Sequence, residues 1–210
     1  RRTCGKAAEE SARQLRELAQ DLGQEVDVKV EEGDLLDHLS EAAGEATLVA
    51  AGQRLRAGGG EGIGSGVEQL LRKIRCPILL APARYVGPER VVVAYGGKEL
   101  GATALAMGAQ AARTLGLPLE VFTAADAEVR GHLAHRARGQ LGDSAPTATF
   151  AGHEGDPGTR ILEHCTRRDL LIMGAYGHSR LYRAVLGSVT NQVIHQARWP
   201  VLLSGRPASA

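Results

Sequence analysis

Apolar residues recur along the chain in two alternating patterns. Short continuous runs, such as the one at 170–173, predict buried strands, whereas longer segments with apolar residues three and four positions apart predict amphipathic helices. Strands are expected at 26–31, 47–51, 78–81, 90–95, 119–124, 147–151, 169–173 and 200–203. Helices are expected at 6–22, 34–43, 66–75, 100–115, 126–141, 157–167 and 188–198. This alternation is typical of an α/β fold in which helices cover both faces of a parallel sheet.

The chain contains an internal repeat, and the repeat indicates its domain organisation. The segment 32–52 resembles 154–174: both open with Glu-Gly-Asp and close with an apolar run and a glycine. The segment 64–80 resembles 187–203: both open with Gly-Ser and close with proline and an apolar strand. We therefore expect two related domains, at 1–83 and 90–205, joined by a proline- and glycine-containing linker at 84–89.

The register of the repeat predicts that the first copy is incomplete at its N-terminus. A step of one repeat back from Arg90 leads to a point about thirty residues before Arg1. The first strand, first helix and second strand of that copy are therefore expected to precede the chain as given. The alternative is a natural short form that borrows strands from another molecule.

Composition narrows the function classes. Hydrophobic residues make up 43% of the chain, aromatic residues 3%, and the formal net charge is +1. An aliphatic core can be built from this composition, but a basic nucleic-acid groove with stacking aromatics is not expected. No apolar run has membrane-spanning length, so no membrane partner is expected. The three cysteines, Cys4, Cys76 and Cys165, are far apart and odd in number, which favours free thiols and a cytoplasmic location.

A glycine-rich segment near the C-terminus carries the clearest functional signal. Gly174, Gly177 and Gly187-Ser188 form the pattern Gly-x2-Gly-x9-Gly-Ser between a predicted buried strand and a predicted helix. Glycine lets the backbone turn tightly and approach a ligand closely. The first amides of a helix lack intrahelical partners and favour an anion such as phosphate. The alternative is a segment that binds no ligand, in which the glycines make a turn and the serine is a helix N-cap.

This pattern, followed by a terminal Pro-Val strand, resembles the nucleotide-binding signature of the universal stress protein family. The resemblance implies two Rossmann-like domains of the adenine nucleotide alpha hydrolase-like kind, with five-stranded parallel sheets in the order 3-2-1-4-5. It also implies an adenine-nucleotide ligand, ATP or AMP, with or without Mg²⁺, and a role in stress response. The residues expected to bind this ligand in the second domain are Ala94, Tyr95, Gly96, Gly174, Gly177, His178, Arg180, Gly187, Ser188 and Val189. Of these, His178 and Arg180, together with Arg183, are cations expected to fold over the phosphates.

The two copies are expected to differ in ligand binding. In the first copy Leu55 occupies the position of the second signature glycine, and the spacing is one residue shorter. Ser65-Gly66-Val67-Glu68 forms a capping box that places a carboxylate where an anion would bind, whereas the second copy has Asn191 there. The first loop is therefore predicted not to hold a triphosphate. The second copy departs from the family at Gly96, where ATP-binding members usually carry an aspartate.

Enzyme chemistry has little support in the sequence, and no catalytic residue is assigned. The seven histidines lack metal-binding spacing, and Asp156 is expected to be a helix N-cap. Three function classes stay open: a nucleotide-binding regulator with at most slow ATP hydrolysis, a stress protein that binds no nucleotide and works through protein contacts, and a related enzyme. The strands at 78–81 and 200–203 are expected to pair antiparallel and make an intrachain pseudo-dimer, and a homodimer is a further expectation.

Overall fold

The computed structural model describes residues 2–53, 65–175 and 186–204. The chain forms two compact units, Arg1–Asp34 and Leu35–Ala210. We describe each unit by itself.

The first unit consists of helix α1 (Arg2–Asp21) and an extended segment. Gly23 ends the helix with a φ of 63°, and the amide of Gln24 donates to the carbonyl of Ala19 at 2.8 Å. The strand predicted at 26–31 is wrong, because residues 24–32 have neither helical nor strand structure. A strand requires a neighbour for its backbone hydrogen bonds, and the described residues provide this segment with no ladder.

The second unit alternates strands and helices as the apolar pattern predicts. Its first part contains α2 (Leu35–Ala42), β1 (Val49–Gly52), α3 (Ser65–Lys73) and β2 (Ile78–Ala81). Residues 82–89 then have no regular structure. The rest contains β3 (Arg90–Ala94), α4 (Glu99–Leu115), β4 (Leu119–Ala124), α5 (Ala127–Leu141), a short 3-10 helix (Gly142–Thr147), β5 (Ala148–His153), α6 (Pro157–His164), β6 (Asp169–Gly174), α7 (Ser188–Gln196) and β7 (Val201–Ser204).

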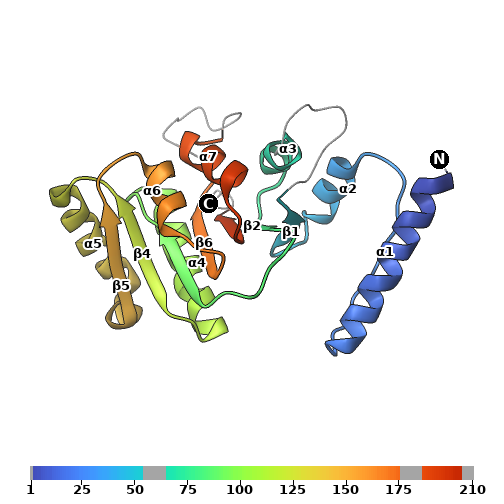
Figure 1. Cartoon of the computed structure of the whole chain (residues 1–210), viewed down its shortest axis with the longest axis horizontal. Helices are drawn as coiled ribbons and strands as arrows, with labels where there is room; N and C mark the ends of the chain where they lie inside the picture. The colour runs from blue at the N-terminus through green and yellow to red at the C-terminus, as the bar shows by residue number, and fades with distance from the viewer. Residues whose placement is uncertain (1, 54–64, 176–185, 205–210) are drawn as a thin grey trace. The chain divides into compact units, whose positions relative to one another are not determined.

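These seven strands form one mixed sheet in the order β1-β2-β7-β6-β3-β4-β5 (Figure 1). All neighbours are parallel except β2 and β7, which are antiparallel with Leu79 opposite Leu202. The two separate five-stranded sheets of the expectation are therefore replaced by a single mixed sheet, in which the five neighbours β5, β4, β3, β6 and β7 are all parallel. The antiparallel pairing expected between the segments 78–81 and 200–203 is present.

Alternate side chains of the strands pack into two apolar clusters. Val91 and Val93 belong to a cluster that contains residues of α4 and α5, whereas Val92 belongs to a cluster that contains residues of α2, α3, α6 and α7. This alternation follows from the pleat of a strand, which directs successive side chains to opposite faces. In Figure 1 the two sets of helices accordingly cover the sheet in the second unit. None of the helices in the described ranges is long and apolar enough to cross a membrane.

Candidate functional site

A cavity of about 390 Å³ lies at the carboxyl ends of β3, β4 and β6. Its walls come from these strand ends and from helices α4, α5, α6 and α7. In the sheet, β3 lies between β4 and β6. The chain adds β4 and β5 on one side of β3 and then returns to add β6 and β7 on the other side. The cavity therefore lies at the point where the strand order reverses. In open α/β sheets this is the usual place for a ligand, because the connecting loops diverge there.

The N-terminus of α7 forms one side of this cavity. Gly187 is the N-cap residue and provides no side-chain acceptor, and the helix begins at Ser188. In the described part of the chain, no acceptor is found for the amides of Ser188, Val189 and Thr190. These three donors and the positive end of the helix dipole are together suited to an anion.

The first turn of α7 is held against the end of β6. The hydroxyl of Thr190, which is 3% exposed, donates to the carbonyl of Gly174 at 2.9 Å. The amide of Gly187 donates to the carbonyl of Ala175 at 3.5 Å. These bonds fix the direction of the helix relative to the strand, and so they fix where its first amides point.

Lys98 brings the only formal charge among the described residues that line the cavity. It is the N-cap residue of α4, and its side chain is exposed to solvent. Gly97, with a φ of 73°, makes the turn that leads from β3 to Lys98. A Cβ at Gly97 would lie 2.3 Å from Cδ2 of Leu133 in α5, so only glycine permits this close approach.

The inner wall of the cavity is apolar. Its lining includes the apolar residues Phe122, Leu133, Ile161 and Met173, which come from β4, α5, α6 and β6. Phe122 also stacks on the ring of His164 with a centroid separation of 4.2 Å. Such a wall excludes water and strengthens any electrostatic contact at the mouth.

The structure places seven of the ten predicted binding residues at this cavity. They are Ala94, Tyr95, Gly96, Gly174, Gly187, Ser188 and Val189. Tyr95 reaches the cavity only in part, because its hydroxyl donates to Oε1 of Gln140 in α5 at 2.8 Å. Gly177, His178 and Arg180, together with Arg183, lie outside the described residues. The sequence reasoning missed Leu133, Ile161 and Met173 as wall residues, since no sequence spacing relates them.

Most of the first copy's loop, including Leu55 and Gly64, also lies outside the described residues. The capping box predicted at α3 depends on the Ser65 side chain, which is outside them as well. Glu68 in the first turn of this helix lies with its Oε1 atom 3.7 Å from Nε2 of His195 in α7.

Asp156 is the N-cap of α6, as the sequence predicts, and its Oδ1 accepts from the amide of Thr159 at 2.9 Å.

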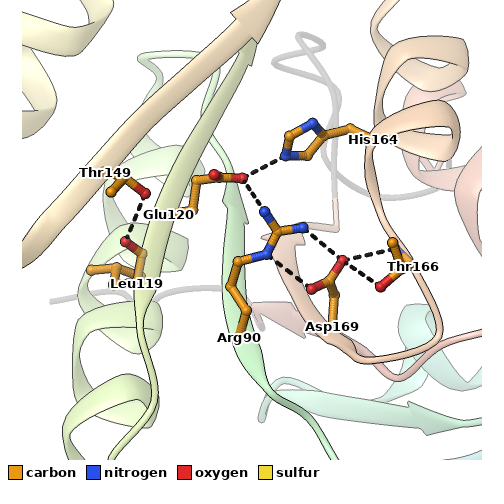
Figure 2. A network of polar contacts seen from close by, with 7 residues as sticks. All are labelled: Arg90, Leu119, Glu120, Thr149, His164, Thr166 and Asp169. Atoms are coloured by element: carbon orange, nitrogen blue, oxygen red, sulfur yellow. Dashed lines mark hydrogen bonds and ion pairs between the residues drawn. The ribbon is translucent and has the colours of Figure 1, made fainter.

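A second polar cluster lies at the opposite, amino-terminal ends of the strands. Figure 2 shows the guanidinium of Arg90 between the carboxylates of Asp169 and Glu120, with His164 next to Glu120. Arg90 donates to both oxygens of Asp169, at 2.9 and 2.8 Å, and to Glu120 at 2.9 Å. The amide of Thr166 also donates to Asp169, at 2.7 Å.

This cluster is a structural device rather than a reactive site. Burial raises the pKa of Asp169, but the hydrogen bonds from Arg90 and Thr166 outweigh burial and lower that pKa below its ordinary value. Burial, together with the nearby Asp169 carboxylate, raises the pKa of the Cys165 thiol to about 12, so this cysteine stays protonated and unreactive at neutral pH. Among the described residues, no group of three or more histidine, cysteine, aspartate or glutamate side chains is arranged to hold a metal ion.

Known proteins resemble this chain in sequence and in structure. Residues 131–204 match the model of the universal stress protein family. The universal stress protein Slr1230 from Synechocystis is 30% identical over 185 residues, which cover 84% of this chain, and the match spans only 64% of that relative's length. A universal stress protein from Archaeoglobus fulgidus has a similar structure, with a TM-score of 0.73 and 20% identity over 96% of this chain and 80% of that one. A universal stress protein solved in complex with cAMP is 22% identical, with a TM-score of 0.49, over 57% of this chain and 98% of that one.

Proposed function

We propose that this protein binds an adenine nucleotide, ATP or AMP, at the cavity between β3, β4 and β6. The proposal starts from the comparisons, because the family model, the curated relatives and the solved structures all indicate a UspA-like member of the universal stress protein family. We propose that binding serves stress-response regulation by changing the surface offered to a protein partner. The observation that carries this proposal is the N-terminus of α7, whose first three amides face the cavity region without an acceptor in the described residues.

The phosphate end of the nucleotide is assigned to this helix terminus. Backbone amides and the helix dipole act together on a negative charge, and the effect is strongest within the first turn. Lys98 adds a positive charge at the same cavity. His178 and Arg180 are proposed to contribute from the loop between the signature glycines.

The nucleoside is assigned to the apolar part of the cavity. A volume of about 390 Å³ lies within the roughly 300–1,000 Å³ of small-molecule sites. The aliphatic residues that α5 and α6 bring to the lining, Val129, Leu133 and Ile161, offer apolar contacts to a planar base. The functional assignment is binding and regulation, with at most slow hydrolysis.

The test is to purify the protein and to ask whether ATP or AMP co-elutes, and then to measure binding by calorimetry for two matched variants. Gly187→Val should abolish binding. The backbone at Gly187, with φ −60° and ψ 142°, is open to any residue, so the effect would come from the side chain that fills the cavity. Gly64→Val, at the matching position of the first copy, should leave binding unchanged. Equal effects of the two substitutions would refute the assignment of the site to the second copy.

A second candidate function is a stress protein that acts through protein contacts alone. It is favoured by one observation: no acidic side chain lines the cavity within the described residues, and Gly96 stands where the family resemblance implies an aspartate. Absence of any nucleotide after purification, and no heat of binding with added ATP or AMP, would favour this candidate.

The tandem organisation is also part of our proposal. The parallel pair β1–β2 follows the same order of elements as the parallel pair β6–β7, and β2 and β7 then meet antiparallel. Two copies related by an approximate two-fold axis would give this pattern of pairing. We propose that this pairing makes an intrachain pseudo-dimer of the first and second domains, and that homodimers form through surfaces outside it.

A further inference from the structure

Helices α3 and α7 occupy matching positions in the two copies of the repeat. Both are nine residues long, both begin at the serine of a Gly-Ser pair, and both precede an apolar strand. Each residue of α7 therefore has a counterpart in α3, and Thr190 corresponds to Val67. A difference between these two residues separates the copy that we propose to bind a nucleotide from the copy that we predict not to.

Thr190 and Val67 have almost the same shape but differ in one group. Both are buried, with exposed fractions of 3% and 1%. The hydroxyl of Thr190 donates to the carbonyl of Gly174, at the end of β6, at 2.9 Å. Valine carries a methyl group in place of this hydroxyl, so Val67 cannot make the same bond to Gly52. The bond between the first turn of the helix and the end of the preceding strand can therefore form in the second copy and not in the first.

The second turn of α7 is held separately, against α6. Nε2 of Gln192 donates to Oγ1 of Thr159 at 3.3 Å. A Cβ at Gly158 would lie 2.1 Å from Oε1 of Gln192, so a side chain at this position would displace Gln192. The matching position of α2 holds Leu36, which is 2% exposed. Because α6 holds the second turn, the bond made by Thr190 is what sets the direction of the first turn.

The hydroxyl of Thr190 does not itself hold the phosphate. It has a single proton, which it donates to Gly174, and an ionised phosphate oxygen accepts hydrogen bonds but donates none. The contribution of this side chain to binding is therefore indirect and acts through the backbone amides that follow Gly187.

We propose that Thr190 is a positioning residue of the phosphate site, whose bond to Gly174 holds the amides of Ser188 and Val189 in the direction that meets the phosphate. This inference rests on the proposed function and names the residue that makes α7, and not α3, competent. Without the bond the first turn samples other directions. The apparent affinity then falls with the fraction of molecules in which the turn stays aligned.

The experiment measures ATP binding by calorimetry on the full chain for three variants. Thr190→Val keeps the shape of the side chain, and Val67 shows that the matching helix accepts valine; binding should weaken about five- to tenfold, the size of one lost hydrogen bond. Thr190→Ser keeps the hydroxyl, so its affinity should stay within about twofold of wild type. Thr149→Val, the control, removes a hydroxyl that donates to Leu119 at 3.4 Å at the amino-terminal end of the sheet and should change nothing (Figure 2). If Thr190→Val does not fold, Thr190→Ala replaces it in the same measurement.

A second measurement separates positioning from a general loss of structure. In NMR spectra of the nucleotide-free Thr190→Val variant, the amides of Ser188 and Val189 should shift, while the amides at the end of β3 should not. Equal ATP affinity of wild type and Thr190→Val would refute the inference while the proposed nucleotide function stands. A Thr190→Ser variant as weak as Thr190→Val, or shifts spread evenly over the sheet, would also refute it. Absence of ATP binding by the wild-type chain would refute both the inference and the proposed function.

Discussion

At the scale of single residues, Arg90 shows how a half-buried charge connects the strands that line the cavity. It lies opposite Asp169 in the β3–β6 pairing and reaches Glu120 in β4. Its side chain therefore connects three parallel strands at their amino ends, while the cavity lies at their carboxyl ends. Burial of this kind stabilises only if every partner is present, since a lone buried charge is costly.

We predict that Asp169→Ala lowers the free energy of unfolding by about 2–4 kcal/mol, because it leaves Arg90 and the amide of Thr166 without their acceptor. Asp169 is 2% exposed, so water cannot replace the lost carboxylate easily. Urea denaturation measures the change. As a control, Glu163→Ala removes an exposed partner of Arg160, and the free energy of unfolding should change by less than about 0.5 kcal/mol.

The lowered pKa of Asp169 also predicts a pH dependence. The stabilisation is fully present above the ordinary aspartate pKa of 3.8 and is lost as the pH falls through the lower pKa of the folded state. The stability gap between wild type and Asp169→Asn should therefore stay constant from pH 7 to 5 and shrink below pH 4. A gap that is unchanged at pH 3 would contradict the ion pair.

A pair of glycines in helices offers a contrasting prediction. A Cβ at Gly108 of α4 would lie 2.1 Å from Cγ2 of Val93, so Gly108→Ala should cost about 1–3 kcal/mol of unfolding free energy through overpacking. Gly131 of α5 has open space around its Cβ position, so Gly131→Ala should add about 0.5–1 kcal/mol. Thermal denaturation of both variants tests the difference, and stabilisation by Gly108→Ala would show that α4 packs differently on β3.

At the scale of elements, the pairing of β2 with β7 joins the first part of the second unit to the rest. Leu80 and Leu203 are fully buried at this junction, and Nε2 of Gln53 donates to the carbonyl of Trp199 at 2.6 Å. The connecting segment around Gly87, whose Cβ position is open, contributes no regular structure. The association should therefore depend on the strands and not on the connection.

We predict that the two parts stay together after the connection is cut. A protease site inserted between Gly87 and Pro88 should give two fragments that co-elute in size-exclusion chromatography. The same insertion combined with Leu80→Asp should release them, because a carboxylate cannot be buried in the paired strands. Separation of the unmodified fragments without denaturant would show that the β2–β7 pairing is too weak to hold them.

Local patterns were sufficient to predict most elements, but not every boundary or pairing. The helix predicted at 157–167 ends at His164, because Asp169 accepts from the amide of Thr166 and turns the chain into β6. The segment 26–31 has strand-like residues but lacks a ladder partner. Pairing is a long-range property, and apolar spacing within one segment does not report it.

The candidate site, like the fold, could be predicted from the sequence only where its residues belong to a local pattern. The pattern Gly174, Gly187-Ser188 is local, and it indicated the helix terminus correctly. Arg90 and Asp169 are 79 residues apart, and no sequence feature connected them. The wall residue Leu133 lies in α5 and approaches the turn at Gly97, which is again a long-range contact.

At the scale of the whole molecule, the second unit is a sheet with the cavity at its reversal point and an ion cluster at the opposite end. The cluster fixes the register of β3, β4 and β6, and the register fixes where the helix termini converge. The central claim is that the first amides of α7 hold a phosphate.

That claim is tested most directly by NMR of the amide groups during a titration with ATP. The account predicts large, saturable shifts of the amides of Ser188, Val189 and Thr190, with smaller shifts at the ends of β3 and β4. If these three amides stay unshifted at millimolar ATP, or if the shifts concentrate on α3 instead, the assignment of the phosphate to α7 is contradicted.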